Sequence, residues 1–201
     1  MHIGVDLDDV LGDYTGAWAG FSNRVYGTNL VRTSFTKFDW KTILGITQED
    51  LAMRIEVFHR SDEFRGIQPV HGAQEGIKSL AEKHELFLVS SRKQEDIEKT
   101  TKWLDQYFPQ AFSSVLHLGS GSEGIKKSRA CFGLQIPLLI DDSLEVATDC
   151  VHAGTRVVLL DTPWNRQSDL STNLIARART WEEVNKIIAS MELFRYHSIE
   201  K

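Results

Sequence analysis

The chain of 201 residues has few cysteines, no patterned histidines and no excess of basic charge. Its two cysteines, Cys131 and Cys150, form neither a CxxC pair nor a disulfide framework, which indicates a reducing compartment and buried thiols. The seven histidines include no HxH or HExxH pattern, so the sequence does not predict a zinc site. The net charge of −5 argues against polynucleotide binding, whereas a small anionic ligand held by a few local cations remains compatible.

Long apolar stretches are also missing. No apolar run reaches the length of a membrane span, so we expect no membrane partner. The first residues have the pattern of a strand instead of a basic segment followed by an apolar stretch, and we therefore expect a cytoplasmic protein. The remaining composition, 41% hydrophobic and 25% charged, is that of a globular chain with one sizeable core and room for a small insert.

From residue 70 onward, short apolar stretches alternate with amphipathic ones. The strand patterns are ELFLVSS, SSVLHLG, PLLIDD and TRVVLL, and helical patterns lie between them and after Thr180. Together with the first apolar run, HIGV, this alternation predicts an α/β fold, a Rossmann-like doubly wound parallel sheet. We assign residues 1–13 and 69–201 to this core.

The segment 14–68 breaks the alternation. It has helical patterns near Tyr14 to Tyr26 and Gln48 to Arg60, and it is rich in aromatic residues. We expect a small helical insert after the first strand, with the aromatic side chains forming its own core and one or two of them facing a ligand, Trp40 being the first choice. The aromatic residues considered are Trp18, Phe21, Tyr26, Phe35, Phe38 and Trp40.

Two predicted strands end in clustered carboxylates. Asp6, Asp8 and Asp9 follow HIGV, and Asp141 and Asp142 follow the apolar part of PLLIDD. At one edge of a parallel sheet, repulsion and desolvation would oppose their ionisation, and a divalent cation with oxygen ligands would relieve both. The sequence therefore predicts a metal site. We expect Asp9 to be a turn residue, and Asp142 is left open between a metal ligand and a cap of the next helix.

The same carboxylates suit phosphoryl transfer. Asp6 and Asp8 can divide the work, one as a nucleophile toward phosphorus and the other as general acid and base. Ser90, at the end of LFLVSS, can donate a hydrogen bond. Lys127 or Lys126 can supply a fixed positive charge, and chemistry alone does not separate the two.

These motifs resemble those of the haloacid dehalogenase (HAD)-like phosphohydrolases. The four motifs are DLDDV with Asp6 and Asp8, FLVSS with Ser90, Lys127, and LLIDDS with Asp141 and Asp142. The resemblance implies a HAD-like fold, with Asp6 as the phosphorylated nucleophile and Asp8 as the acid and base. It also implies Mg²⁺ as the cofactor, bound by Asp6, by the main-chain carbonyl of Asp8 and by Asp141. The family spacing favours Lys127 over Lys126.

A narrower resemblance is to the 5'(3')-deoxyribonucleotidases and their bacterial relatives, and it lies in HRSDEF, LVSSR, KKSRACFGLQIPLLIDDS and DTPWNR. It implies a Mg²⁺-dependent phosphomonoesterase that hydrolyses (deoxy)nucleoside monophosphates through an aspartyl-phosphate, with segment 14–68 as a cap. Ser91 and Arg92 are candidates for phosphate contact, although the start of a surface loop explains them nearly as well. Two departures are that Asp9 stands where many relatives have glycine and that Ser90 replaces the commoner threonine.

Two alternatives to a nucleotidase remain open. One is a phosphatase of another small metabolite, such as a sugar or cofactor phosphate. The other is a regulatory module that binds metal and phosphate without turnover, against which the intact Asp6 and Asp8 weigh. A phosphatase acting on nucleic-acid ends is disfavoured by the acidic charge balance. We expect a small phosphorylated metabolite as the partner, and whether the chain forms a homodimer is left open.

Overall fold

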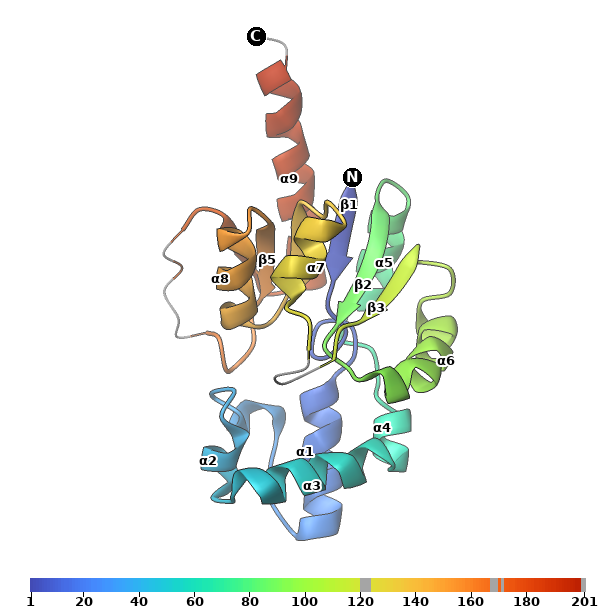
Figure 1. Cartoon of the computed structure of the whole chain (residues 1–201), viewed down its shortest axis with the longest axis vertical. Coiled ribbons are helices and arrows are strands. Elements are labelled where there is room, and N and C mark those ends of the chain that lie inside the picture. Colours follow the sequence, from blue (N-terminus) through green and yellow to red (C-terminus); the bar gives the residue numbers. More distant parts are fainter. Residues whose placement is uncertain (120–123, 167–169, 171, 200–201) are drawn as a thin grey trace.

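The computed structural model describes residues 1–119, 124–166, 170 and 172–199, with side chains described as far as residue 191. Within these residues, six strands form one sheet in which every neighbouring pair is parallel (Figure 1). The strands are β1 (His2–Val5), β2 (Glu85–Ser90), β3 (Ser114–His117), β4 (Leu138–Asp141), β5 (Arg156–Leu160) and β6 (Ile175–Ala178), in the spatial order β3-β2-β1-β4-β5-β6. The order reverses between β1 and β4, and the carboxyl ends of the strands at such a reversal are the usual ligand site in open α/β sheets.

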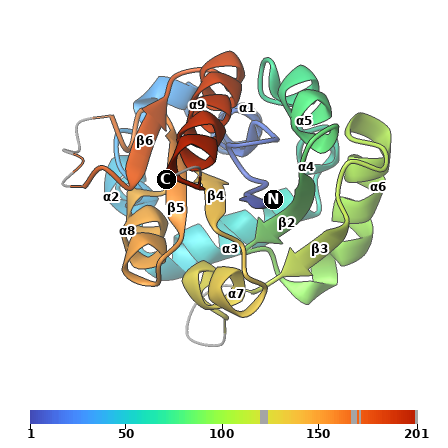
Figure 2. The same ribbon diagram turned by 90° about the horizontal axis from the view of Figure 1, so that it is seen from above.

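Helices cover both faces of this sheet (Figure 2). On one face lie α5 (Ala73–Ala81), α6 (Ile97–Tyr107) and α9 (Trp181–Ile199), and on the other lie α7 (Lys127–Gly133) and α8 (Leu144–His152). Alternate residues of β4 serve the two layers, because Leu138 and Ile140 pack in one buried cluster and Leu139 in the other. The predicted α/β, Rossmann-like doubly wound sheet is therefore confirmed.

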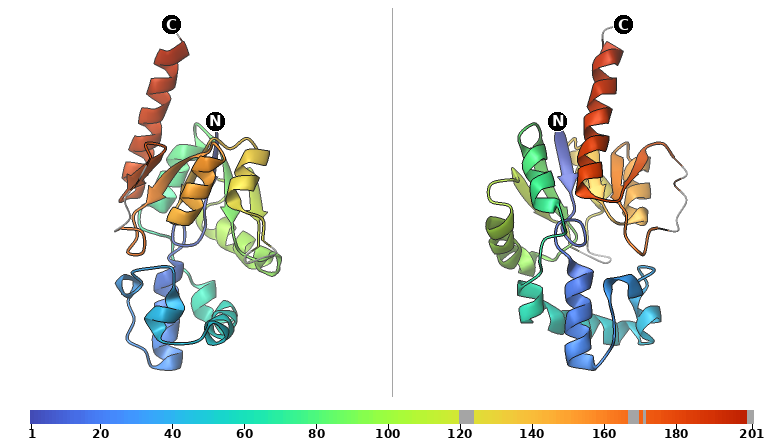
Figure 3. Two further views of the ribbon diagram at one scale, coloured as in Figure 1. Left: turned by 60° about the vertical axis from the view of Figure 1, so that its left-hand side comes forward. Right: turned by 180° about the vertical axis from the view of Figure 1, so that it is seen from behind.

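The insert consists of α1 (Tyr14–Tyr26), α2 (Trp40–Leu44), α3 (Gln48–His59) and α4 (Asp62–Arg65), which lie beyond the carboxyl edge of the sheet (Figures 1 and 3). The chain leaves and re-enters the core at one place, since the Asp13 N–H donates to the Gln68 carbonyl at 2.9 Å. Asp13 also caps α1 through a bond from the Gly16 N–H, and Thr47 caps α3.

Aromatic side chains fill the centre of the insert. Trp18, Phe21, Phe35 and Phe58 are at most 1% exposed, and Trp40 packs on Phe35 and Trp18 at its side. These rings are continuous with the buried cluster on one face of the sheet, so the insert does not have a separate core of its own. Rings in contact contribute both buried apolar area and edge-to-face attraction, which holds four short helices together without a sheet of their own.

Two local features differ from the sequence prediction. The first strand ends at Val5, so the acidic residues after it belong to a loop in which Gly12 N–H donates to the Leu7 carbonyl at 3.0 Å. Strand β6 was not predicted, because its sequence, IARA, has no apolar run. In the described residues, α9 is the longest helix, and none of the helices there is long and apolar enough to cross a bilayer.

Candidate active site

Two carboxylates and one lysine meet at the carboxyl edge of the sheet. Asp6 directly follows β1, and its N–H donates to the Ile140 carbonyl at 2.9 Å, which holds it beside β4. Asp141 is the last residue of β4, and Lys127 is the first residue of α7. The Lys127 Nζ lies 2.6 Å from Asp6 Oδ1 and 2.8 Å from Asp141 Oδ2, and all three side chains are buried. Three separate elements therefore bring these charges together.

Asp142 adds a third carboxylate to this group. One oxygen from each of Asp6, Asp141 and Asp142 lies within 4.8 Å of the others. Asp142 does not cap the next helix, because the Ser143 hydroxyl accepts the bond from the Val146 N–H at the start of α8. Of the two alternatives for Asp142 in the sequence, the helix cap is wrong.

The electrostatics of this group favour a bound cation. Burial raises the pKa of Asp6 to about 7, opposed by Lys127 and reinforced by Asp141. Burial and the neighbouring Asp141 also raise the pKa of Asp142. The pKa of Lys127 is raised because Asp141 and Asp6 together outweigh the effect of burial. Three carboxylates are buried together and Lys127 pairs with only two of them, and carboxylate oxygens are the ligands that Mg²⁺ prefers, so the residues fit the metal that the motifs imply.

Asp8 points away from this group and toward a buried arginine. Arg92 donates to both oxygens of Asp8, from Nε at 3.0 Å and from Nη2 at 2.6 Å. The arginine is also bonded to Thr100 and lies over the ring of Phe64 in α4. Its side chain is only 8% exposed, although Arg92 stands in the loop that follows β2. The neighbouring Ser91 is exposed and lines the same cavity as Arg92.

Asp9 is a turn residue, as expected from the sequence. Its φ of 62° lies in the left-handed region that glycine adopts most easily. Its buried carboxylate accepts bonds from the Thr15 N–H at 3.1 Å and the Thr15 hydroxyl at 2.5 Å, and it pairs with Arg32 at 2.8 Å. These bonds compensate for the backbone strain at Asp9. They also hold the loop after β1 against two parts of the insert, Thr15 of α1 and Arg32.

The remaining sequence candidates lie at the same edge or outside it. Ser90 ends β2 and is 1% exposed, and its hydroxyl accepts a bond from the Arg92 N–H at 3.1 Å. Lys126 is exposed and pairs with Asp149 on α8 at 2.6 Å, away from the carboxylates. The structure thus separates the two adjacent lysines by position, with Lys127 inside the group and Lys126 on the surface.

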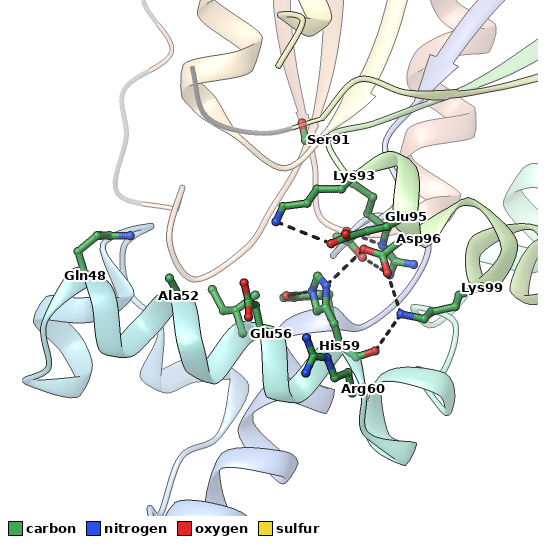
Figure 4. A pocket seen from close by; sticks show the side chains of 14 residues that line it. Gln48, Ala52, Glu56, His59, Arg60, Ser91, Lys93, Glu95, Asp96 and Lys99 are labelled. Atoms are coloured by element: carbon green, nitrogen blue, oxygen red, sulfur yellow. Dashed lines mark hydrogen bonds and ion pairs between the residues drawn. The ribbon is translucent and has the colours of Figure 1, made fainter. Parts of the chain in front are cut away.

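A cavity of about 650 Å³ lies between the insert and the core, and the close view in Figure 4 shows its walls. One wall is α3, with Gln48, Ala52 and Glu56, and the opposite wall includes Lys93 and Lys99 of the core. The cavity also reaches Asp8, Tyr14 and Arg92. Of the carboxylates that follow β1 and β4, Asp8 lines this cavity, whereas Asp6, Asp141 and Asp142 are not among its lining residues.

The aromatic residues proposed for ligand contact do not line this cavity. Trp40, Trp18 and Phe35 belong to the aromatic core of the insert, and Phe38 packs against Trp164 instead. Tyr14 is the aromatic residue among the lining side chains, and its hydroxyl lies 2.9 Å from His59 Nε2. The expectation that Trp40 faces the ligand is therefore not supported by this cavity.

Sequence reasoning missed several residues of the site. Arg92 pairs with Asp8 and Trp164 bonds to Asp142 from loops, and Arg32 pairs with Asp9 from the start of a short 3-10 helix (Arg32–Ser34). No local pattern predicts these contacts. The one available signal was the run DTPWNR, in which a proline and an asparagine indicate a tight turn after a strand.

Comparison with known proteins identifies the family to which the sequence is similar. The sequence matches the family described as "5' nucleotidase, deoxy (Pyrimidine), cytosolic type C protein" over residues 1–194. A 5'(3')-deoxyribonucleotidase of Bacillus subtilis is 25% identical over 186 residues, which cover 92% of this chain and 96% of that protein. A nucleotidase of Clostridium acetobutylicum is 24% identical over 193 residues, covering 94% of this chain and 93% of that protein.

Solved structures share the fold. A haloacid dehalogenase-like protein of Streptococcus pneumoniae has a TM-score of 0.65 at 12% identity, covering 93% of this chain and 97% of that chain. A HAD hydrolase of Bacillus subtilis bound to magnesium has a TM-score of 0.59 at 16% identity, covering 92% and 97%. The family match spans almost the whole chain, and it includes both strands that carry the carboxylates. The chain therefore belongs to this nucleotidase family, is a phosphatase and has a haloacid dehalogenase-like fold.

Proposed function

We propose that the chain is a Mg²⁺-dependent phosphomonoesterase that works through an aspartyl-phosphate on Asp6 and hydrolyses (deoxy)nucleoside monophosphates. The observation that carries the proposal is the buried group of Asp6, Asp141 and Asp142 around Lys127 at the carboxyl edge of the sheet. Burying several carboxylates together destabilises the folded protein. Such groups are found mainly at functional sites, where a cation and a substrate bind to them. The names of the relatives support the nucleotide as substrate.

In this proposal, a carboxylate oxygen of Asp6 attacks phosphorus and forms an acyl phosphate, while the bond from phosphorus to the ester oxygen breaks. Asp8 protonates the leaving oxygen and then removes a proton from the water that cleaves the aspartyl-phosphate. Lys127 and the Ser90 hydroxyl hold the phosphoryl oxygens. Because Arg92 donates to both oxygens of Asp8, we propose that Asp8 leaves the guanidinium when the substrate binds, which frees an oxygen to carry the proton.

The metal would be held by the carboxylates of Asp6, Asp141 and Asp142 and by the main-chain carbonyl of Asp8. When bound, Mg²⁺ neutralises the phosphoryl oxygens that otherwise repel an anionic nucleophile. Lys127 contributes a positive charge that does not depend on the metal, because Asp141 and Asp6 raise its pKa. The protein therefore retains part of the compensating charge at the site in the absence of the ion.

The leaving group would occupy the cavity under α3. Asp8 is both the proposed proton donor and a residue that lines the cavity, so the part of the substrate beyond the ester oxygen extends into it. The insert, residues 14–68, would then act as a cap that closes over the substrate and excludes water. Polar and charged side chains dominate the labelled walls in Figure 4, which suits the hydrogen-bonding groups of a nucleoside.

The proposal is tested by phosphate release from deoxynucleotides, ribonucleotides and sugar phosphates, each with Mg²⁺ and with chelator. We expect deoxynucleoside monophosphates to have the highest kcat/KM and all release to require Mg²⁺. Faster release from a sugar or cofactor phosphate would favour the alternative metabolite phosphatase. No release from any ester in the presence of Mg²⁺ would contradict the enzymatic role.

A bulky residue on the cavity wall should affect nucleotides selectively. Ala52 is an exposed residue of α3 that lines the cavity, so Ala52→Phe should lower kcat/KM on a deoxynucleotide about tenfold or more and change turnover of a small aryl phosphate far less. Met53→Phe is the matched control, because Met53 is 57% exposed on the same helix and does not line the cavity. Equal losses on both esters, or in both variants, would contradict the cavity as the leaving-group site.

The adjacent lysines should differ sharply. Lys127→Ala should lower kcat about a hundredfold or more, because it removes a charge beside the phosphoryl group. Lys126→Ala should leave kcat within about twofold, since Lys126 is exposed and paired with Asp149. Steady-state kinetics in saturating Mg²⁺, with thermal unfolding to confirm folding, decide the point. The reverse ranking would show that Lys126 is the functional lysine.

A further inference from the structure

The loop after β5, with the sequence DTPWNR, is built around Asp142. Asn165 is 1% exposed, and its amide donates to the Asp142 carbonyl at 2.7 Å and to the Leu160 carbonyl at 2.8 Å. The Asn165 side-chain oxygen accepts from the Thr162 N–H at 3.2 Å and from Arg177 at 2.5 Å. The backbone of Asp142 is thus fixed by an asparagine whose hydrogen-bonding capacity is fully engaged in the core.

Trp164 fixes the side chain of the same aspartate. Its indole Nε1 donates to Asp142 Oδ2 at 2.7 Å, and the tryptophan is 9% exposed. An indole N–H orients a carboxylate oxygen without bringing a charge, so it limits rotation of Asp142 without competing with a cation for its negative charge. Lys127, which bonds to the other two carboxylates, has no bond of this kind to Asp142 among the described contacts.

Two residues of the insert rest on the same indole. The guanidinium of Arg32 lies 5.2 Å from the Trp164 ring centroid, and the Phe38 ring meets Trp164 edge to face at 5.9 Å. Arg32 also pairs with Asp9 in the loop after β1. The insert therefore contacts Trp164, and Trp164 in turn is hydrogen-bonded to Asp142.

We propose that Trp164 is a positioning residue that orients Asp142 for the metal and transmits the docking of the insert to the metal site. This inference rests on the proposed Mg²⁺ site. Arg32 and Phe38 pack on the indole only when the insert lies in its present place, so a docked insert holds the indole against Asp142. By thermodynamic reciprocity, a bound metal in turn favours the docked insert.

Calorimetric titration of Mg²⁺ into chelator-treated Trp164→Phe tests the positioning role. The variant keeps an aromatic ring and loses the N–H, and we expect its Mg²⁺ dissociation constant to rise about tenfold or more. Trp103→Phe is the matched control, because Trp103 is 8% exposed and its Nε1 donates at 2.7 Å to the Ile67 carbonyl, in a part of the core that contains no carboxylate of the site. Its affinity for Mg²⁺ should match that of the parent.

The thermal unfolding of all three metal-free proteins accompanies the titration, so that lost stability is not mistaken for lost affinity. Equal Mg²⁺ affinity in Trp164→Phe and the parent would overturn the inference, as would an equal loss in Trp103→Phe. A parent that binds no Mg²⁺ would overturn the proposed metal site and this inference together. If the parent and Trp164→Phe both bind Mg²⁺ with the same affinity, the proposed function stands and only the role of Trp164 is lost.

The contact with the insert is tested by Phe38→Ala. Phe38 is 55% exposed, so its truncation should change stability little, yet we expect a several-fold weaker Mg²⁺ affinity because the indole loses its support. Met53→Ala is the control, since Met53 is 57% exposed on the same insert and makes no described contact with Trp164. Equal Mg²⁺ affinity in the two variants would overturn the transmission from the insert.

Discussion

Asp6→Asn should lose activity by about three orders of magnitude or more, because a carboxamide keeps the shape of the side chain and is a very poor nucleophile. The fold should persist. In the absence of a cation, the free energy of unfolding should be at least that of the parent near neutral pH, since burial already raises the pKa of Asp6 to about 7 and the amide resembles the neutral acid. Phosphate release and thermal unfolding measure the two effects.

Asp149→Asn is a suitable control for this change. Asp149 is a partly exposed carboxylate of α8 that pairs with Lys126 on the surface, so the same exchange there should leave turnover within about twofold. Turnover of Asp6→Asn within about tenfold of the parent would contradict a covalent intermediate on Asp6, because loss of a nucleophile costs far more.

Removal of Mg²⁺ should abolish turnover and lower thermal stability, with a size that depends on pH. Burial, reinforced by Asp141, raises the pKa of Asp6 from 3.8 to about 7, and burial also raises that of Asp142. The folded metal-free chain thus binds protons that the unfolded chain has released, and its free energy of unfolding falls as pH rises from about 4 to about 7. Mg²⁺ binds the deprotonated carboxylates, so it should stabilise the protein most above that range.

Thermal unfolding with Mg²⁺ and with chelator, at about pH 5 and about pH 8, checks this prediction. At pH 8 and free Mg²⁺ about a hundredfold above its Kd, we expect about 2.7 kcal/mol of stabilisation, or about 5–10 °C in Tm for a chain of this size. The shift should shrink at pH 5. If the samples with chelator had the same Tm as the samples with Mg²⁺ at both pH values, the result would contradict a metal site at these carboxylates.

The strands that carry the site could be predicted from the sequence because each is a short apolar run. In a parallel sheet such runs are buried on both faces, and the polar residues that follow them mark the carboxyl edge. The proximity of Asp6 and Asp141 follows from that edge, whereas Lys127 reaches them from the start of α7. Strand β6 could not be predicted in the same way, because the sequence IARA of this edge strand has no such run.

The parts that could not be predicted depend on how the insert docks. The pairing of Asp8 with Arg92 needs the backbone turn after β2 and the Phe64 ring from α4, which are far apart in the sequence. The bond from Trp164 to Asp142 likewise needs the loop after β5 to fold back over the end of β4. Local propensity and periodicity describe single elements, whereas these contacts are set by tertiary packing.

The packing of the insert also explains why Trp40 does not line the cavity. Aromatic content indicates apolar area to be buried, and a four-helix insert with no sheet must use that area for itself. Trp40 packs on Phe35 with ring centroids 4.7 Å apart, and the cavity wall is left to polar and small residues of α3, such as Gln48 and Ala52.

The account is tested most directly by trapping the intermediate. The parent enzyme is mixed with Mg²⁺ and a deoxynucleotide that carries a radiolabelled phosphate, quenched in acid at times shorter than one turnover, and digested for peptide mapping. We predict label on the peptide that contains Asp6, rising and falling as phosphate is released, and none in Asp6→Asn. Release of all the phosphate without label on that peptide above the Asp6→Asn background, at any quench time, would contradict phosphoryl transfer through Asp6.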